Sequence, residues 1–183
     1  TRYQGVRVRF DAKARTLYLE GEPAAVGRGV TLLVGDTIIY NDSTKLVVAR
    51  GDTLILRDPT QNAADVVSRG ELRYNIEAHR GSVTNIRTVL EQGEQWIVNA
   101  PNAVFIADTT RGRQTAFYVR NGTITSCDDS LPDYHFKSKQ IKMISRSLMV
   151  ARPAVLYIGD VPVMWLPFVF QDVRGGRHSG LLP

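Results

Sequence analysis

The stretch that decides the fold reads Thr37-Ile38-Ile39-Tyr40 and continues into the turn-prone sequence Asn41-Asp42-Ser43-Thr44. A run of apolar and β-branched residues that ends in Asx and hydroxyl residues is typical of a half-buried strand followed by a tight turn. A second strand-like run follows, and Gly51 stands eleven residues after Tyr40. The stretch therefore predicts a unit of strand, turn, strand, glycine and strand.

The unit recurs in the first half of the chain. Alternating runs also end at Phe10-Asp11 and at Tyr74-Asn75, and Gly21 and Asn85 follow the two aromatic residues at the same distance. Asp and Asn tolerate the left-handed turn conformation, and Gly relieves a tight corner. Units that recur in this way can stack on one another as hairpin-like modules. An ordinary β-sandwich spaces its turns similarly, so the pattern leaves that alternative open.

Period-two alternation of apolar and polar residues extends beyond these units and predicts an all-β fold. It is clear in residues 6–10, 16–20, 53–57 and 71–74, whereas windows with helical periodicity are almost absent. Alternation of this kind is typical of strands with one buried face. The dipeptide Asn121-Gly122 lies between two apolar runs, and it predicts a hairpin with a type I′ turn.

Length and charge limit the classes of partner. The chain has 183 residues, of which 43% are hydrophobic, enough for one domain or an elongated repeat fold. The formal net charge is +5, which suits a phosphate-bearing partner such as nucleic acid, anionic lipid or the phosphorylated head of a glycolipid. The arginines are scattered along strands and no RNA-binding aromatic pattern occurs, so nucleic acid is not an expected partner. No apolar run approaches the ~18 residues that a membrane-spanning helix needs.

No constellation of residues indicates an enzyme, a metal site or a cofactor. Cys127 is the only cysteine, and His79, His135 and His178 are far apart in the sequence. Ser179-Gly180 lacks the flanking glycine of a nucleophile elbow. We therefore expect no catalytic activity, no metal and no cofactor. A β-helical carbohydrate-active enzyme is the enzymatic alternative.

A second informative stretch lies near the C-terminal end of the sequence. It reads Pro162-Val163-Met164-Trp165-Leu166-Pro167-Phe168 and, after a polar turn, Arg177-His178-Ser179-Gly180-Leu181-Leu182-Pro183. Proline cannot donate to a sheet ladder, so the residues between Pro162 and Pro167 can pair only over a short distance. We expect another domain to begin at this end.

This stretch resembles the lipopolysaccharide-assembly outer-membrane proteins, the LptD or OstA-like family, at the junction where a periplasmic β-jelly roll meets a transmembrane β-barrel. Residues 36–44 with 49–52 resemble the family's OstA-like repeat, and residues 71–75 with 80–85 resemble it more loosely. His178 stands where a second arginine is usual, and Asp172 where a proline is common. The positions that fit the junction pattern are Pro162, Trp165, Pro167, Phe168, Arg177, Ser179, Gly180, Leu181 and Pro183.

The resemblance implies an open antiparallel β-jelly roll of stacked strand-turn-strand repeats. Residues 1–160 would form this periplasmic jelly roll, and residues 161–183 would be the junction to a C-terminal barrel. The protein would bind the acyl chains of lipopolysaccharide in an apolar slot and pass the lipid to the barrel for insertion in the outer leaflet. Its partners at the periplasmic face of the outer membrane would be lipopolysaccharide, a jelly-roll bridge protein of the same transport system and the lipoprotein plug of the barrel. A structural module that stacks edge-to-edge with similar domains through residues 1–10 is the alternative.

Alternating apolar positions supply the candidates for the slot, although such residues are usually plain core in a β protein. Burial of alkyl chains contributes about 0.8 kcal/mol per CH₂ without directional bonds, so a slot between two sheets can hold long chains. The expected slot residues are Val8, Phe10, Leu17, Leu19, Ile38, Tyr40, Val48, Leu54, Leu56, Leu72, Tyr74, Val83, Trp96, Val98, Val104, Ile106, Phe117 and Val119. The expected junction and exit residues are Pro162, Trp165, Leu166, Pro167, Phe168, Arg177, Gly180 and Pro183.

The single cysteine lies in a segment that also resembles the family. Thr125-Ser126-Cys127 is similar to the family's Thr-x-Cys turn, which precedes an aromatic-rich strand. The resemblance implies a disulfide between Cys127 and a cysteine in the C-terminal region of the barrel, outside this sequence. A free, half-buried cysteine without a role is the alternative.

Overall fold

The described residues form a single antiparallel sheet of thirteen strands. The computed structural model describes residues 2–28, 31–57, 66–92, 94–108, 114–144 and 148–172. The strands are β1 (Arg2–Gln4), β2 (Arg7–Asp11), β3 (Thr16–Arg28), β4 (Thr31–Asn41), β5 (Leu46–Arg57), β6 (Val66–Asn75), β7 (Arg80–Gln92), β8 (Glu94–Asp108), β9 (Gln114–Thr125), β10 (Tyr134–Ile144), β11 (Leu148–Ile158), β12 (Val161–Leu166) and β13 (Val169–Asp172).

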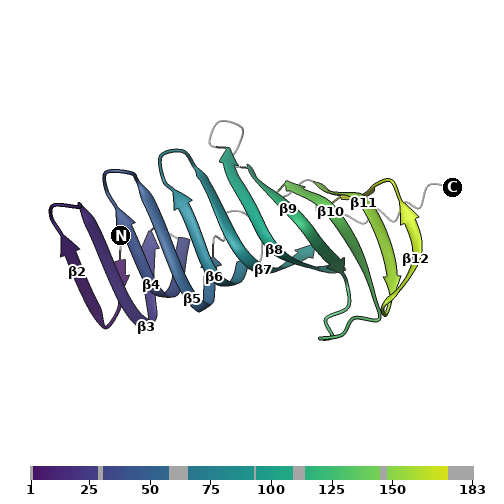
Figure 1. The fold of residues 1–183 in the computed structure, drawn as a ribbon, viewed down its shortest axis with the longest axis horizontal. Helices are drawn as coiled ribbons and strands as arrows, with labels where there is room; N and C mark the ends of the chain where they lie inside the picture. The colour runs from purple at the N-terminus through teal and green to yellow at the C-terminus, as the bar shows by residue number, and fades with distance from the viewer. Residues whose placement is uncertain are drawn as a thin grey trace.

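From β3 to β12, strands that are consecutive in the sequence are neighbours in the sheet (Figure 1). The order is β1-β3-β4-β5-β6-β7-β8-β9-β10-β11-β12, with β2 also on β3 and β13 also on β11. The described residues contain no helix, which confirms the all-β prediction. Within that part of the chain there is accordingly no helix suited to cross a membrane.

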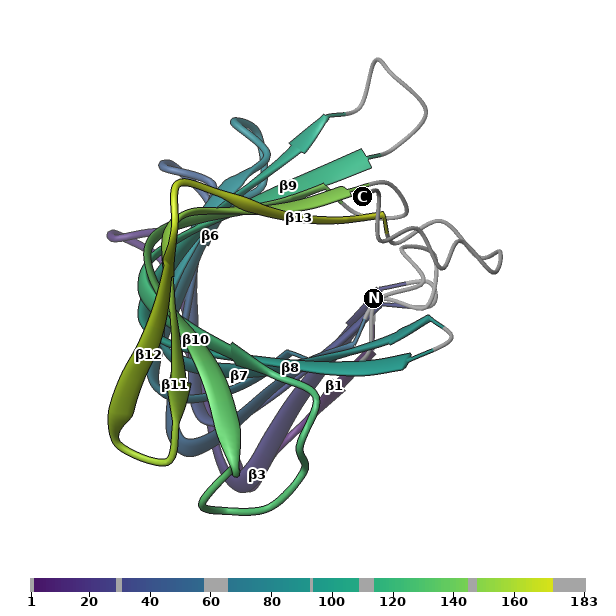
Figure 2. The ribbon, with the colours of Figure 1, turned by 90° about the vertical axis from the view of Figure 1, so that its right-hand side faces the viewer.

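The sheet is folded into two layers that are joined along one side. Figure 2 looks along the row of strands and shows the layers meeting at the left and standing apart at the right. Long strands pass from one layer to the other. At the ends of the row, β1 and β2 pair with separate parts of β3, and β12 and β13 pair with separate parts of β11. We call the layer that contains β2 and β13 the first layer, and the one that contains β1 and β12 the second. The expected open antiparallel roll is confirmed.

The strands bend where they change layer, and the repeat residues lie at these bends. The ladder between β3 and β4 is interrupted around Gly21, and the ladder between β5 and β6 is interrupted after Gly51. A Cβ atom on Gly51 would lie 2.6 Å from Asp36 Oδ2, so the close approach of β4 requires glycine there. Asn85 in β7 has a left-handed φ of 47°. The corners predicted from the repeat are therefore confirmed.

The hairpin predicted at Asn121-Gly122 is wrong. Strand β9 continues through both residues and pairs with β8 and β10 on either side of them. Asn121 has a φ of 53°, and a Cβ on Gly122 would lie 2.6 Å from Ile141 Cδ1. The tolerance of Asn and Gly for a left-handed or crowded backbone serves a bend within a strand here, and not a chain reversal.

The turns at 12–15, 42–45 and 76–79 share one capping arrangement. The Asx residue before each turn accepts a hydrogen bond from the backbone N–H three residues later, as local Asx side chains do. These residues are Asp11, Asn41 and Asn75, with N···O distances of 3.0, 2.9 and 2.7 Å. The last residue of each turn has a left-handed φ, which is 49° at Arg15, 55° at Lys45 and 49° at His79.

Two asparagine side chains tie successive turns together. Asn41 Nδ2 donates to the carbonyl oxygen of Ala14, and Asn75 Nδ2 donates to that of Thr44, both at 3.0 Å. The backbone N–H of the residue after each asparagine also donates to the preceding turn. The first half of the chain is therefore a stack of repeats, as one of the two sequence interpretations predicted.

The core lies between the two layers, and one line of paired residues crosses it from β3 to β11. None of its members is more than 3% exposed. This core line consists of Leu19, Ile38, Ala49, Leu72, Val83, Ala103, Val119, Ile141 and Ala151. Small and large residues follow one another irregularly along it.

Candidate functional site

Two further lines of paired residues flank the core line on the inner face, one in each layer. The first line consists of Leu17, Tyr40, Val47, Tyr74, Gly81, Phe105, Phe117, Met143 and Met149. The second line consists of Val26, Leu33, Leu56, Val66, Thr88, Val98, Ile124, Phe136, Leu156 and Met164. Apart from glycine and threonine, both lines present apolar side chains along the whole row of strands.

Aromatic rings pack in the middle of the first line. The Tyr74 and Phe105 rings are stacked with centroids 5.6 Å apart, and Phe117 lies 5.8 Å from Phe105. Gly81 makes room for this arrangement, because a Cβ there would lie 2.2 Å from Phe105 Cζ. Tyr74 and Phe117 are only half-buried, so this cluster keeps accessible apolar surface on the inner face.

Most residues expected in the slot lie on the inner face. The fully buried ones are Leu19, Ile38, Leu54, Leu72, Val83, Val98 and Val119. The half-buried ones are Leu17, Tyr40, Leu56, Tyr74, Trp96 and Phe117. Val8 and Phe10 pair with Leu19 and Leu17 and share their face, but they are 60% and 64% exposed because β2 is an edge strand. Contact of these residues with lipid stays a prediction.

Three expected slot residues point away from the inner face. Val48 pairs with Ile39 and Arg73, Val104 pairs with Ser82 and Tyr118, and Ile106 pairs with Arg80 and Ala116. Their neighbours in sequence occupy the inner positions instead. In β8 the phase of the alternation reverses at the bend, because Val98 and Ala100 face inward before Pro101 whereas Ala103 and Phe105 do so after it. Val48, Val104 and Ile106 therefore cannot line a slot between the layers.

Many inner-face residues were missed by the sequence interpretation. They are Ala24, Val26, Leu33, Val47, Ala49, Val66, Ile86, Ala100, Ala103, Phe105, Ile124, Phe136, Ile141, Met143, Met149 and Ala151. Alternation in residues 134–144 and 148–158 could have revealed those in β10 and β11. The alanines carry no such signal and become recognisable only from the register.

Residues 161–172, the described part of the segment expected to be a junction, complete the sheet. Leu166 pairs with the buried Ala154, and Met164 continues the second line, so both belong to the inner face. Trp165 pairs with Val155 on the outer face and is 63% exposed. Pro162 lies beside a register shift in β12, and Pro167 separates β12 from β13. Phe168 is exposed. Arg177, Gly180 and Pro183 lie outside the described residues.

Carboxylates link neighbouring turns and neighbouring strands in the first half of the chain. Asp42 accepts a hydrogen bond from Lys45 Nζ at 2.7 Å and one from the Tyr40 hydroxyl at 3.1 Å, and it pairs with Arg15. Lys45 contributes most to lowering the pKa of Asp42 below its usual value. These contacts join the first two turns of the repeat.

Glu71 forms a second charged link. Arg50 Nε donates to Glu71 at 2.8 Å, and Arg73 also pairs with this carboxylate. Arg73 first and Arg50 second lower the pKa of Glu71. The carboxylate therefore stays ionised to a lower pH than an unpaired glutamate, and it holds β5 and β6 together on their outer side.

His135 and Cys127 occupy the region between β9 and β11. The imidazole of His135 stacks on Tyr157 with centroids 5.2 Å apart, and burial, followed by the charge of Lys137, lowers its pKa. Cys127 is half-buried and free; its thiol lies 3.7 Å from Asp129 Oδ2. Among the described residues no group of three His, Cys, Asp or Glu side chains could hold a metal ion. The expected disulfide of Cys127 stays a prediction.

The comparisons with known proteins agree with the family resemblance. No protein-family model matches the chain. A protein named LPS-assembly protein LptD from Azoarcus sp. (strain BH72) is 25% identical over a 190-residue alignment that covers 100% of this chain and 22% of that protein. The protein of the same name from Bordetella avium (strain 197N) is 25% identical, with 90% of this chain and 20% of that protein covered. The resemblance to lipopolysaccharide-assembly proteins is confirmed. The chain spans about a fifth of the length of these curated relatives.

One solved structure is also similar. It is the crystal structure of LptH from Pseudomonas aeruginosa, described as the LptA-homologous periplasmic component of the conserved lipopolysaccharide transport device. The similarity covers 57% of this chain and 73% of that chain, with a TM-score of 0.48 and 17% sequence identity.

Proposed function

We propose that this chain carries lipopolysaccharide through its acyl chains and passes the lipid to an outer-membrane β-barrel for insertion in the outer leaflet. The observation that carries the proposal is the inner face, where two apolar lines flank the core line across the row of strands. The similarity to proteins named LPS-assembly protein LptD along the whole chain supports it. The chain would act without catalysis, as one portion of a longer protein at the periplasmic face of the outer membrane.

The geometry of the inner face suits an alkyl chain. Apolar burial contributes about 25 cal/mol per Å² and needs no directional bonds, so a chain could slide from one strand to the next without breaking specific contacts. Half-buried residues of both lines, such as Leu56 and Phe117, keep apolar surface accessible on this face. The layers stand apart on one side (Figure 2), so a bulky hydrophilic head could remain outside while its chains lie between the layers.

The two ends of the row would serve as entry and exit. At the β2 end, Val6, Val8 and Phe10 are 90%, 60% and 64% exposed, and an edge strand can accept a strand of a partner. A jelly-roll bridge protein would dock there. At the other end, Met164 and Leu166 continue the inner face. They belong to residues 161–183, the proposed junction to the barrel and its lipoprotein plug. A purely structural bridging role would use the same exposed edge and would need no lipid.

Site-specific photo-crosslinking tests the proposal with neighbouring aromatic residues. Phe117 faces inward, whereas Tyr118 follows it on the outer face and is 42% exposed. A benzophenone amino acid at position 117 should capture lipopolysaccharide, and the same probe at position 118 should capture little. Equal capture at both positions, or capture at 118 alone, would show that acyl chains do not lie between the layers.

A tether between the roll and the barrel belongs to the same proposal. Cys127 lies in the loop after β9 and forms no disulfide in this chain, so its proposed partner would be a cysteine of the barrel. Non-reducing electrophoresis of an exported longer chain that includes the barrel should show a mobility shift that Cys127→Ser removes. Full alkylation of Cys127 in that protein without reduction would contradict the tether.

A further inference from the structure

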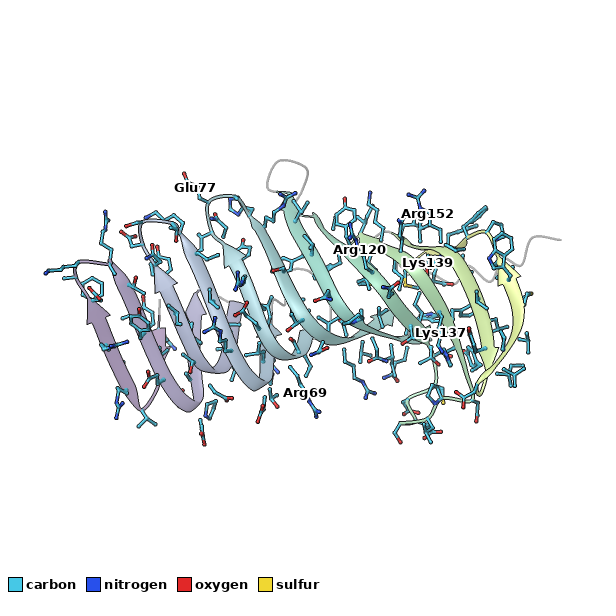
Figure 3. All side chains as sticks on the ribbon, viewed as in Figure 1. Arg69, Glu77, Arg120, Lys137, Lys139 and Arg152 are labelled. Carbon is cyan, nitrogen blue, oxygen red and sulfur yellow. The ribbon has the colours of Figure 1, made fainter. Side chains whose placement is uncertain are left out.

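Four basic side chains form a group on the outer face of β9, β10 and β11. They are Arg120, Lys139, Lys142 and Arg152, all exposed. Figure 3 shows Arg120, Lys139 and Arg152 close together on this side of the roll. We call this group the basic ridge. None of its members forms an ion pair within the described part of the chain.

The register brings the members of the ridge together. Gln140 pairs with Arg120 on one side and Arg152 on the other, and Arg152 Nε donates to Gln140 Oε1 at 3.2 Å. A neutral amide therefore stands where a carboxylate would cancel both charges. Lys142 is two residues further along β10, with its Nζ 5.5 Å from the centroid of the Tyr118 ring.

Two arginines at the other end of the sheet are arranged differently, because each of them is paired with a carboxylate. There Arg7 lies 3.7 Å from Glu20, and Arg50 lies 2.8 Å from Glu71. Beyond β9 the acidic residues in the described ranges are Asp128, Asp129, Asp133, Asp160 and Asp172. The first four lie in the loop before β10 and in the turn after β11, and Asp172 is the last residue of β13, where it pairs with Leu148. The ridge thus keeps its positive charge available to another molecule.

Two exposed aromatic rings adjoin the ridge on the same face. Phe168 and Phe170 are 56% and 61% exposed, and their rings stack with centroids 6.3 Å apart. Phe170 pairs with Val150, and Val150 pairs with Lys142, so these three side chains share the outer face. The surface therefore combines unpaired cations with an apolar pair at the edge strand β13.

We propose that the basic ridge and the Phe168–Phe170 pair bind the surface of a bilayer that contains anionic phospholipids. Guanidinium and ammonium groups form charge-assisted hydrogen bonds with phosphate oxygens. Aromatic side chains beside such cations can enter the boundary between headgroups and acyl chains. A soluble polyanion would use the cations but leave the phenylalanine pair exposed, which is why a lipid surface fits both. This contact uses the outer face, so it is independent of the acyl-chain function proposed for the inner face.

Co-sedimentation with lipid vesicles tests the proposal on the 183-residue chain. The chain should bind vesicles of equimolar phosphatidylcholine and phosphatidylglycerol, and not vesicles of phosphatidylcholine alone. High salt should weaken this binding because it screens surface charges. Each basic residue near an anionic surface contributes about fivefold to partitioning, so the double variant Arg120→Gln/Arg152→Gln should bind ~25-fold more weakly.

A matched control removes the same net charge elsewhere on the outer face. The variant Arg7→Gln/Arg50→Gln alters two arginines that are already paired with Glu20 and Glu71. Its vesicle binding should change less than about threefold, because those charges are already compensated. Equal losses in the two double variants would overturn the proposal, since they would reflect net charge alone. Thermal melting of each variant establishes that it is folded before binding is compared.

Two further results distinguish the sources of phosphate. Phe170→Ala should weaken binding to the anionic vesicles even in high salt, where the contribution of the cations is small.

If the Arg120/Arg152 variant binds vesicles as the wild type does but loses lipopolysaccharide capture at position 117, the ridge binds the head of the carried lipid and the bilayer proposal is wrong. If capture at position 117 never occurs while vesicle binding follows the ridge, only the inner-face function fails.

Discussion

The two ends of the sheet share one core but differ on the outer face. From β2 to β7 the turns are joined by Asn41 and Asn75, and the carboxylates of Asp42 and Glu71 bind neighbouring basic side chains. From β9 to β13 the described cations of the ridge lack such partners. The core line crosses both regions without interruption. Carboxylates thus pair with basic side chains in the first region, whereas the ridge in the second region keeps its charges available for binding, and this difference can be tested region by region.

The largest effect is expected from the core line, and it should be the same in both regions. Leu72 in β6 and Ile141 in β10 are each 2% exposed. Replacement of either residue by Ala should lower the free energy of unfolding by about 2–5 kcal/mol, because the cavity adds to the lost transfer free energy. Urea unfolding of the wild type and both variants measures these changes in the free energy of unfolding.

A marked inequality would contradict a shared core. If Ile141→Ala lowered the free energy of unfolding by less than about 1 kcal/mol while Leu72→Ala reached the expected range, the two regions would have to unfold separately. The exposed Arg69→Ala provides a control in a neighbouring position of β6 that should change the stability by less than about 0.5 kcal/mol.

The turns of the repeat could be predicted from the sequence because their chemistry is local. Asp11, Asn41 and Asn75 cap the turns that directly follow them, so a short stretch of sequence contains both partners. Gly51 could be predicted as a corner from its place in the repeat, whereas the residue that crowds it, Asp36, lies on the neighbouring strand β4 and is known only from the structure. The alternation of apolar and polar residues could also be recognised in the sequence on either side of each bend.

The inner face beyond the bends could not be predicted in the same way. A bend shifts the phase of the alternation, and the number of residues in the bend cannot be determined from the sequence. Val104 and Ile106 were assigned inward for this reason, whereas Ala103 and Phe105 hold those positions. Asn121-Gly122 shows the same limit, because one dipeptide suits both a hairpin and a bend. The basic ridge depends on pairing across three strands, which no local pattern contains.

A smaller effect is expected from the asparagine that joins the second and third turns. Asn75→Asp keeps the oxygen that accepts from the Ala78 N–H but removes the Nδ2 donor to the Thr44 carbonyl. Loss of one such hydrogen bond should lower the free energy of unfolding by about 0.5–1.5 kcal/mol. Asp11→Asn is the matched control, because Asp11 caps the first turn of the repeat with its oxygen alone. Equal stabilities of wild type and Asn75→Asp in urea would show that the side-chain link between turns contributes nothing.

The smallest effect concerns acid, and it should appear only where carboxylates are paired. The pKa of Glu71 in the folded chain lies below its ordinary value of 4.5, because Arg73 and Arg50 stabilise the charged form. A depressed folded pKa contributes stability that is present above the unfolded pKa and lost as the pH falls through the folded pKa.

The Glu71 carboxylate is partly exposed, so its pairs should contribute no more than about 1 kcal/mol. Glu71→Gln should therefore be less stable than wild type at neutral pH, and the difference should shrink as the pH falls below the ordinary value of 4.5 and disappear once the pH is below the lowered pKa of the folded chain. Glu77, an exposed residue of the third turn, provides the control, and Glu77→Gln should be as stable as the wild type at neutral pH. Urea midpoints measured across this pH range decide the matter, and a Glu71→Gln deficit that persists unchanged in acid would mean that the side chain stabilises β5 and β6 by packing and not by charge.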